Sequence, residues 1–330
     1  MTGAIPVGLS GRPVRVGLDV GGTKIDAVAV SPDGDILARL RRPTGWGEEA
    51  VVVSIIDAVD ALAVDGGFAR SAVESVGVGI PGLVDADTGR VLHAVNLGVE
   101  SLDLAGFAGR QLGIPVRVEN DVKAAALGAA VLRGVDGSMA YLNLGTGVAA
   151  GIVIDGTIWR GARGTAGEVG HLSVDPNGRL CGCGQRGCIE TFCGGGALAR
   201  AWDRPGALPV RDILDAAEAG DERAAGLRAD LFHGAAAAVR ALVLSADVER
   251  VIIGGGLTSL GERLFAGVRR ALQTGAEASP FMRSLHLDDR IELLPAGSPA
   301  AAFGAAVVGA TTPSKAVSYT HLRAHETKAN

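Results

Sequence analysis

One short segment holds every cysteine of this chain: residues 171–193, which read HLSVDPNGRLCGCGQRGCIETFC. Thiolate sulfur and imidazole nitrogen are the usual ligands of tetrahedral structural zinc. The spacing predicts a structural zinc site with one nitrogen and three sulfur ligands, from His171, Cys181, Cys183 and Cys188. Disulfides or free thiols are the alternatives, and Cys193 could replace the histidine. We favour His171, because CIETFC is expected to begin a helix that carries Cys193 away.

A candidate catalytic base lies in VENDVKAAALG, residues 118–128. Asp121 stands there between a strand and a helix, so it could serve only as the helix N-cap. It could instead accept a proton, because the positive end of the helix favours its ionised form. That chemistry suits phosphoryl transfer to a hydroxyl group, in which the proton leaves late.

Further polar side chains are expected beside the zinc segment. Glu190 follows Cys188 by two residues, and Glu168 precedes His171 in the motif EVGH. A bound metal would fix these side chains at one edge of a cleft. Carboxylate and imidazole groups suit a polyhydroxylated ligand, whose hydroxyls both donate and accept hydrogen bonds. The alternative for the two glutamates is salt bridging within loops.

Three glycine-rich turns follow or end apolar strands: DVGGTK (19–24), LGTGVAAG (144–151) and IIGGGL (252–257). Glycine lets backbone N–H groups approach phosphate oxygens without obstruction by a Cβ atom. None has the GxxxxGK[ST] pattern of a Walker loop, and each could be only a tight hairpin. The candidate phosphate- and nucleotide-binding residues are Gly21, Gly22, Thr23, Lys24, Gly145, Thr146, Gly147, Gly254, Gly255 and Gly256.

The elements that would position these residues follow one plan twice. GLDVGGTKIDAVAVSPDG and YLNLGTGVAAGIVIDG each contain an apolar strand, a glycine-rich turn, a second apolar strand and an acidic-glycine turn. This duplication predicts two α/β lobes with a ligand cleft between them. Three consecutive antiparallel strands are predicted within 14–44, and a buried strand that ends in a Gly/Pro break is predicted within 73–85. Further strands are predicted at 115–119, within 138–161, at 250–256 and near 291–294. Helices are predicted at 48–64, 101–112, 121–133, 196–204, 209–218, 221–245 and 299–310, with one more between 257 and 290.

Composition and charge exclude several classes of protein. Hydrophobic residues make up 48% and charged residues 20% of the 330, as in globular proteins. The net charge of −5 lacks the basic excess of nucleic-acid binders. The N-terminus is a poor signal peptide, and the apolar stretches near 124–132 and 235–246 are shorter than a membrane span. We therefore expect a cytoplasmic protein without nucleic-acid or membrane partners. Residues 317–330 are unlike the rest and are predicted to be a non-native or disordered tail.

Six motifs together resemble the ROK sugar kinases and repressors over about residues 14–312: DVGGTK, ENDVKAA, GTGVAAG, EVGH, CGCGQRGCIE and IIGGGL. The resemblance implies the two-lobed α/β actin-like (ribonuclease H-like) ATPase fold, with a duplicated β-rich core and an interlobe cleft. The small N-terminal lobe would comprise residues 14–119 and 300–315. The large C-terminal lobe would comprise 120–299 and carry the zinc loop, 171–190.

The resemblance also implies roles for residues at matching positions. Asp121 would be the catalytic base, and His171 would present one ring nitrogen to zinc and the other to a sugar. The sugar-binding residues would be Asn96, Asn120, Asp121, Glu168, His171 and Glu190. ATP, accompanied by Mg²⁺, would bind at the glycine turns, with Gly254 to Gly256 lining the adenosine pocket. The implied assembly is a homodimer or a homotetramer.

The expected activity is ATP-dependent phosphorylation of a hexose at its 6-hydroxyl, with glucose first. A kinase for an N-acetylhexosamine or fructose is the alternative, because the sequence departs from the family at Val99, Glu100, Lys123, Ala149 and Ala150. Polyphosphate is an alternative to ATP as the phosphoryl donor. A sugar-responsive transcriptional repressor is a further alternative. We expect no DNA-binding segment, since the DVGGTK motif begins at Asp19.

Overall fold

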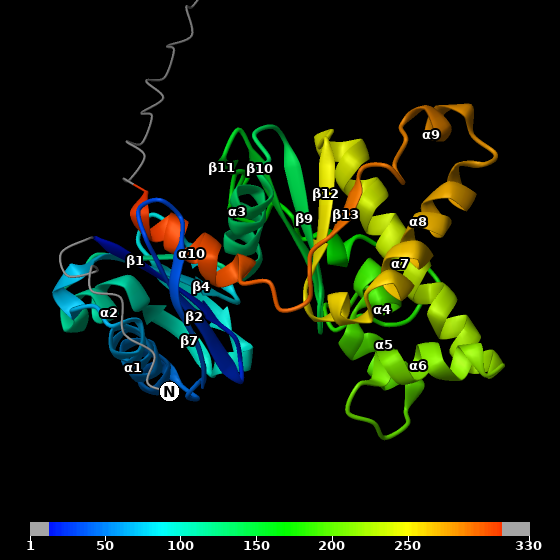
Figure 1. Cartoon of the computed structure of the whole chain (residues 1–330). Coiled ribbons are helices and arrows are strands. Elements are labelled where there is room, and N and C mark those ends of the chain that lie inside the picture. The colour runs from blue at the N-terminus through cyan, green and yellow to red at the C-terminus, as the bar shows by residue number, and fades with distance from the viewer. Residues whose placement is uncertain (1–12, 312–330) are drawn as a thin grey trace, which may run out of the picture.

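The computed structural model describes residues 13–311, which form two five-stranded sheets of the same design (Figure 1). The first sheet has the order β3 (Ile36–Pro43), β2 (Lys24–Val30), β1 (Val14–Val20), β4 (Val73–Ile80), β8 (Val116–Asn120). The second has the order β11 (Thr157–Ile158), β10 (Val148–Ile154), β9 (Met139–Leu144), β12 (Arg250–Gly254), β13 (Ile291–Leu293). In each sheet three consecutive strands are antiparallel. A fourth strand pairs parallel with the first of them, and a fifth pairs parallel with the fourth. The predicted duplication and fold class are confirmed.

A third, smaller sheet was not predicted from the sequence. It contains β5 (Leu83–Asp85), β6 (Arg90–Ala94) and β7 (Val99–Asp103). The buried strand predicted within 73–85 is confirmed as β4, which ends at the predicted Gly/Pro break of Pro81 and Gly82; the chain then enters the new sheet. The helix predicted from residue 101 begins at Leu104, where Asp103 caps it through its side chain.

Helices cover the outer faces of both sheets. On the first sheet lie α1 (Glu48–Gly66) and α2 (Leu104–Leu112). On the second lie α4 (Ile189–Cys193), α5 (Gly195–Trp202), α6 (Pro209–Glu218), α7 (Glu222–Ala246) and α8 (Glu262–Ala276), with α9 (Pro280–Ser284) packed on α8. Four short 3-10 helices complete the described elements: η1 (Arg70–Ala72), η2 (Val95–Leu97), η3 (Val169–His171) and η4 (Gly256–Leu260).

Two helices lie side by side between the sheets, α3 (Asp121–Arg133) and α10 (Ala300–Ala310) (Figure 1). Helix α10 covers the inner face of the first sheet, and α3 covers the inner face of the second. Their contact depends on glycine: a Cβ atom at Gly304 would lie 1.8 Å from the Ala124 carbonyl oxygen. A Cβ at Gly77 of β4 would lie 1.7 Å from the carbonyl oxygen of Ala305. The backbones therefore approach too closely for any larger residue.

Helix α7 is long and apolar enough to cross a membrane by length and composition alone. Half of its most apolar window is buried, and it packs against α4, α6 and α8 in the core of the second sheet. We interpret it as a core helix. The predicted boundaries of the two lobes remain a proposal that this packing supports, and the predicted tail 317–330 lies outside the described residues.

Candidate functional site

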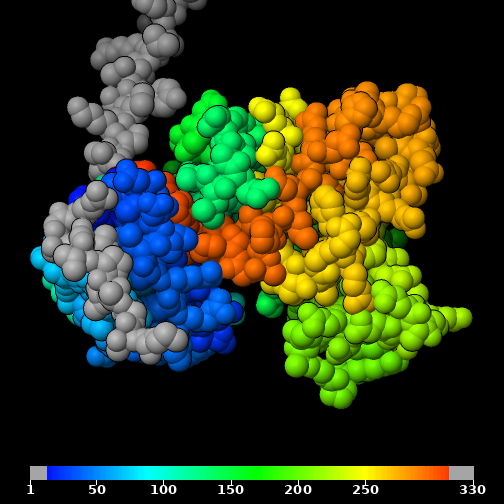
Figure 2. All heavy atoms as spheres, in the orientation of Figure 1, coloured from blue at the N-terminus to red at the C-terminus, as the bar shows by residue number. Residues whose placement is uncertain are grey.

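The carboxyl ends of several strands from both sheets meet at a cavity of about 310 Å³. Ligands of open α/β sheets bind at such strand ends. Asp19 at the end of β1, Asp121 at the start of α3 and Gly254 at the end of β12 all contribute to the wall. The lining residues also include Lys24, Tyr141, Asn143, Gly255, Gly256, Thr258, Gly297 and Ser298. Figure 2 shows an open hollow between the two lobes.

Asp121 is not the N-cap of its helix. The Asn120 side-chain oxygen caps α3 instead, accepting hydrogen bonds from the amides of Val122 (3.1 Å) and Lys123 (3.2 Å). Burial raises the pKa of Asp121, although the amides of Val122 and Asp121 itself lower it. We had expected the helix terminus to favour ionisation, but the loss of water has the larger effect. A raised pKa moves a carboxylate toward the range of an efficient general base.

Asp19 is a second carboxyl group in the same cavity, and the sequence analysis gave it no role. Burial raises the pKa of Asp19 to about 7, with Asp121 and Asp26 adding to the effect and Lys24 opposing it. Two acidic groups and one lysine therefore share one enclosure. A carboxyl group with a raised pKa at a cavity wall, like Asp19, is a candidate for binding a cation or a protonated partner.

Tyr141 of β9 forms part of the cavity wall and is 6% exposed. Its ring packs on Gly254, where an added Cβ would lie 2.2 Å from Cε2 and 2.3 Å from the hydroxyl oxygen. Burial raises the pKa of the phenol well above its ordinary value. Tyr141 therefore remains a neutral hydrogen-bond donor or acceptor across the physiological pH range.

The first glycine turn, 21–24, lies against the turn that carries Asn96. Gly21 donates its amide to the carbonyl of Lys24 at 2.9 Å, which closes the hairpin between β1 and β2. A Cβ at Gly22 would lie 2.8 Å from the carbonyl oxygen and 3.2 Å from Cβ of Asn96. The exposed Asn96 is thus held next to the predicted phosphate turn.

The second glycine turn, 145–147, is tied to α4 and α5. Glu190 accepts a hydrogen bond from the Val148 amide through Oε2 at 2.9 Å. The amides of Gly195 and Gly196 donate to the carbonyls of Gly145 (2.8 Å) and Thr146 (2.9 Å). The predicted sugar ligand Glu190 therefore also positions the predicted phosphate turn.

The EVGH loop packs on the strand that follows this turn. Gly167 has φ of +97°, and a Cβ there would lie 1.9 Å from the carbonyl oxygen of Ala150. A Cβ at Gly170 would lie 1.9 Å from the carbonyl oxygen of Val148. These contacts bring Glu168 toward the cleft, and its charge raises the pKa of Asp121. The charge of Glu168 therefore acts on Asp121.

The four predicted metal ligands form one cluster. Their nearest ligand atoms all lie within 4.8 Å of one another. The Cys183 and Cys188 sulfur atoms are 3.7 Å apart, and Cys181 Sγ is 3.8 Å from His171 Nδ1. Ligands about 2.3 Å from a tetrahedral zinc ion would be separated by about 3.8 Å, so the donor set fits that ion. Cys193 is buried in the core of the second lobe, where its sulfur contacts the carbonyl oxygen of Ile189, as expected for a residue outside the cluster.

An ion pair between a buried glutamate and a partly exposed arginine lies beside the junction of β8 and α3. Glu119 is 1% exposed and precedes Asn120 at the end of β8. Arg160 pairs with Glu119 Oε2 through Nε (2.8 Å) and Nη2 (2.6 Å). This ion pair joins the first sheet to the segment that leads to Glu168.

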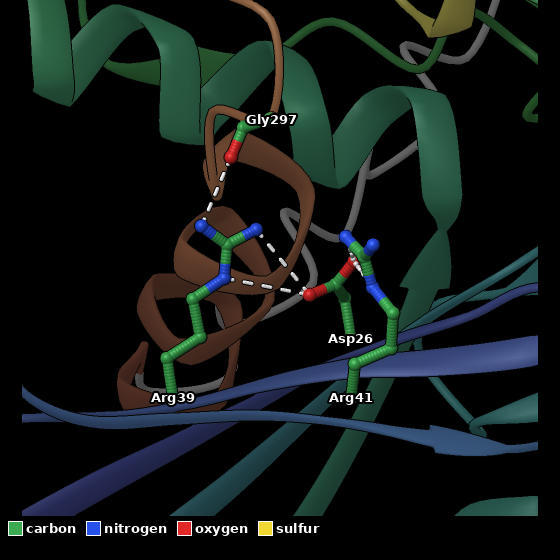
Figure 3. A network of polar contacts seen from close by, with 4 residues as sticks. All are labelled: Asp26, Arg39, Arg41 and Gly297. Carbon is green, nitrogen blue, oxygen red and sulfur yellow. Dashed lines mark hydrogen bonds and ion pairs between the residues drawn. The ribbon is translucent and has the colours of Figure 1, made fainter.

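A polar network joins β2 and β3 to the loop that precedes α10 (Figure 3). The Asp26 carboxylate lies between the guanidinium groups of Arg39 and Arg41. Arg39 also donates from Nη1 to the Gly297 carbonyl oxygen at 2.9 Å. Because Gly297 lines the cavity, the network connects the edge of the first sheet to the cavity wall.

Comparison with known proteins places this geometry in a family. The family model described as ROK family matches residues 15–310. The chain belongs to the ROK family. Among its ROK relatives, a glucokinase of Halalkalibacterium halodurans is 32% identical over 282 residues, covering 79% of this chain and 86% of that protein. An N-acetylmannosamine kinase of Haemophilus influenzae is 32% identical over 264 residues, covering 78% and 84%.

A solved ROK family glucokinase from Streptomyces griseus, in complex with glucose and AMPPNP, shares this fold with a TM-score of 0.72. It is 32% identical, and the match covers 90% of this chain and 99% of that one.

In this ROK chain the structure places five of the predicted site residues in the cavity wall. The predicted sugar contacts Asn96, Asn120, Glu168, His171 and Glu190 and the turns 21–23 and 145–147 are not among the lining residues. Asp121, Lys24 and Gly254 to Gly256 line the cavity. The first glycine turn contacts Asn96, and the strand that follows the second glycine turn is hydrogen-bonded to Glu190. Asp19, Tyr141, Asn143 and Ser298 also line the cavity and were missed. The one available signal was Asp19, an acidic residue that ends an otherwise apolar strand.

Proposed function

We propose that this chain catalyses ATP-dependent phosphorylation of a hexose at its 6-hydroxyl, with glucose as the first candidate and Asp121 as the general base. The observation that carries the proposal is the shared cavity: Asp121 lies with Asp19, Lys24 and the turn 254–256 at the interlobe strand ends. The similarity to glucokinases over most of the chain supports the same activity.

The sugar side of the site is built from groups that exchange hydrogen bonds with hydroxyls. Asn96, Asn120, Glu168, His171 and Glu190 are the proposed contacts. Asn120 is oriented by its cap to α3 and by a 3.4 Å hydrogen bond from Nδ2 to the Gly82 carbonyl oxygen. Asp121 takes the hydroxyl proton as the oxygen attacks phosphorus, and its raised pKa suits that transfer.

The phosphate side is built from backbone amides and one lysine. The turns 21–24 and 145–147 present N–H groups from opposite lobes, and Lys24 lies in the cavity wall. These donors would hold the phosphates in line with the attacking oxygen, which is the main requirement of phosphoryl transfer. The oxygen ligands of Asp19 fit Mg²⁺, which neutralises phosphate charge when bound with ATP.

The cluster of His171, Cys181, Cys183 and Cys188 is proposed to hold one structural Zn²⁺. The cluster geometry supports this, since all four ligands are protein atoms and leave no open position. With Nδ1 on the metal side, the other ring nitrogen of His171 would be available to the sugar. The same segment continues into Glu190, so the metal would also restrain that carboxylate.

A coupled assay of ADP release over a panel of hexoses tests the proposal. We expect turnover with glucose and ATP above that with fructose or N-acetylated hexosamines. Absence of turnover with every sugar and ATP would refute it.

N-acetylmannosamine is the second candidate substrate. The identity with the Haemophilus influenzae kinase is equal to that with the glucokinase, which favours including it. Turnover with N-acetylmannosamine above that with glucose would decide for this alternative.

Association into a homodimer or homotetramer and a cytoplasmic location are further parts of the proposal. Sedimentation of the purified chain tests the first, and cell fractionation tests the second.

A further inference from the structure

An exposed tryptophan lies against the turn that carries Asn96, at the edge of the proposed sugar site. Trp46, between β3 and α1, is 70% exposed. Single exposed apolar residues are common on protein surfaces, so exposure alone carries no meaning. The position of Trp46 relative to two site turns is what distinguishes it.

Three loops of the first lobe meet at this residue. The amide of Gly47 donates to the carbonyl of Leu97 at 2.8 Å, and the amide of Thr44 donates to the carbonyl of Thr23 at 3.2 Å. The loop that carries Trp46 is thereby bonded on one side to the Asn96 turn and on the other to the first phosphate turn.

The indole itself packs on the Asn96 turn. Gly98 has φ of +67°, and a Cβ there would lie 2.7 Å from both Cε2 and Nε1 of Trp46. One edge of the ring is therefore fixed against backbone while most of its surface stays open to solvent. In Figure 2 the blue end of the first lobe, which carries β2, β3 and the start of α1, faces the hollow between the lobes.

A hexose has an apolar surface that an exposed indole can contact. A pyranose ring has a rim of hydroxyls and two faces of C–H bonds, and the proposed polar contacts can satisfy only the rim. A rigid indole supplies a large apolar surface at small entropic cost, and its covering by a ligand is favourable.

We propose that Trp46 is a sugar-contact residue whose indole stacks on a C–H face of the hexose ring. The inference rests on the proposed function, since it takes Asn96 and the interlobe hollow as the sugar site. Trp46 then contributes to sugar affinity and makes no contact with the nucleotide.

Steady-state kinetics of Trp46→Ala, Trp46→Phe and Phe281→Ala test the proposal. Aromatic contacts contribute enough that Trp46→Ala should raise the KM for glucose about tenfold. The KM for ATP and kcat should stay near their wild-type values, and Trp46→Phe should recover most of the affinity. Phe281, 62% exposed on the remote α9, is the matched control and should change nothing. An unchanged KM for glucose in Trp46→Ala would overturn the proposal.

A binding measurement keeps the test independent of turnover and of the stability of the alanine variant. Trp159→Phe protein retains two of the three tryptophans, and Trp46 is the exposed one, because Trp202 is 3% exposed. Glucose should change the emission of Trp46 and protect it from acrylamide quenching. No change at saturating glucose would overturn the proposal. If glucose protects Trp46 but no sugar is phosphorylated, the proposed function fails while the sugar contact stands.

Discussion

Asp19 and Asp121 place two carboxyl groups in one cavity, and burial raises the pKa of each. For Asp19 the folded-state pKa is about 7, against 3.8 for the free group. Between these values the folded protein binds more protons at this site than the unfolded chain does. The free energy of unfolding therefore falls as pH rises from about 4 to about 7, and the loss is complete above that range.

Asp19→Asn removes this dependence, and the difference in stability between the variant and the wild type should grow with pH. We expect the variant to gain up to about 4 kcal/mol relative to wild type at pH 8, and far less at pH 5. Urea unfolding of both proteins at the two pH values measures this. An equal difference at pH 5 and pH 8 would contradict the assignment of a raised pKa to Asp19.

At the scale of single elements, the close packing of α3 against α10 depends on glycines that have no side chain. Gly304→Ala places a methyl group against the carbonyl of Ala124, and overpacking of this kind costs about 1–3 kcal/mol. Gly226→Ala is the matched control, because Gly226 is exposed in α7 with nothing within 4 Å. The control should gain about 0.5–1 kcal/mol from helix propensity. Denaturant unfolding should show a lower free energy of unfolding for Gly304→Ala and a higher one for Gly226→Ala. Changes of the same sign in both variants would contradict the packing.

The zinc loop is the second element whose stability depends on particular side chains. Metal analysis of purified protein should give about one zinc per chain, and Cys183→Ser should lose it. Cys193→Ser is the control, because Cys193 lies in the core outside the cluster and should retain zinc. Equal zinc content in both variants would contradict the ligand set.

Elements predictable from local sequence were the ones with strong patterns. The four predicted zinc ligands lie within one short segment, and the structure brings their side chains into one cluster. Helix α3 was predicted from Asn120 and Gly134, which stand at its two ends. The third sheet was missed because its strands are short and mixed in polarity, with the burial pattern of β5 alternating exposed and half-buried residues. The pKa of Asp121 could not be predicted either, since burial depends on the whole fold.

At the scale of the whole molecule, residues far apart in sequence make the cavity. Asp19, Tyr141 and Ser298 come together only because both sheets direct their strand ends to the same place. No local pattern marks Tyr141 or Ser298, so sequence analysis could not find them. The duplication itself was readable, because both copies keep the same order of strand, glycine turn and strand.

The network of Figure 3 also joins residues far apart in the sequence, and it predicts an effect on the KM for ATP. Arg39→Ala removes the hydrogen bond to Gly297, and we expect the KM for ATP to rise about fivefold, since one partly exposed charged hydrogen bond contributes about 1 kcal/mol. Arg41→Ala is the control, because Arg41 pairs with Asp26 but, among the described residues, makes no hydrogen bond to Gly297. Equal KM values for ATP in the two variants would contradict a role for the Gly297 contact.

The central claim is that Asp121 accepts the sugar proton in the interlobe cavity, and one comparison tests it most directly. Turnover of glucose with ATP should be measured for wild type and Asp121→Asn, together with glucose binding by calorimetry. We predict that the variant binds glucose but that its kcat falls by about 10²–10⁴-fold, the contribution of a general base. Turnover of Asp121→Asn close to the wild-type rate would contradict the account.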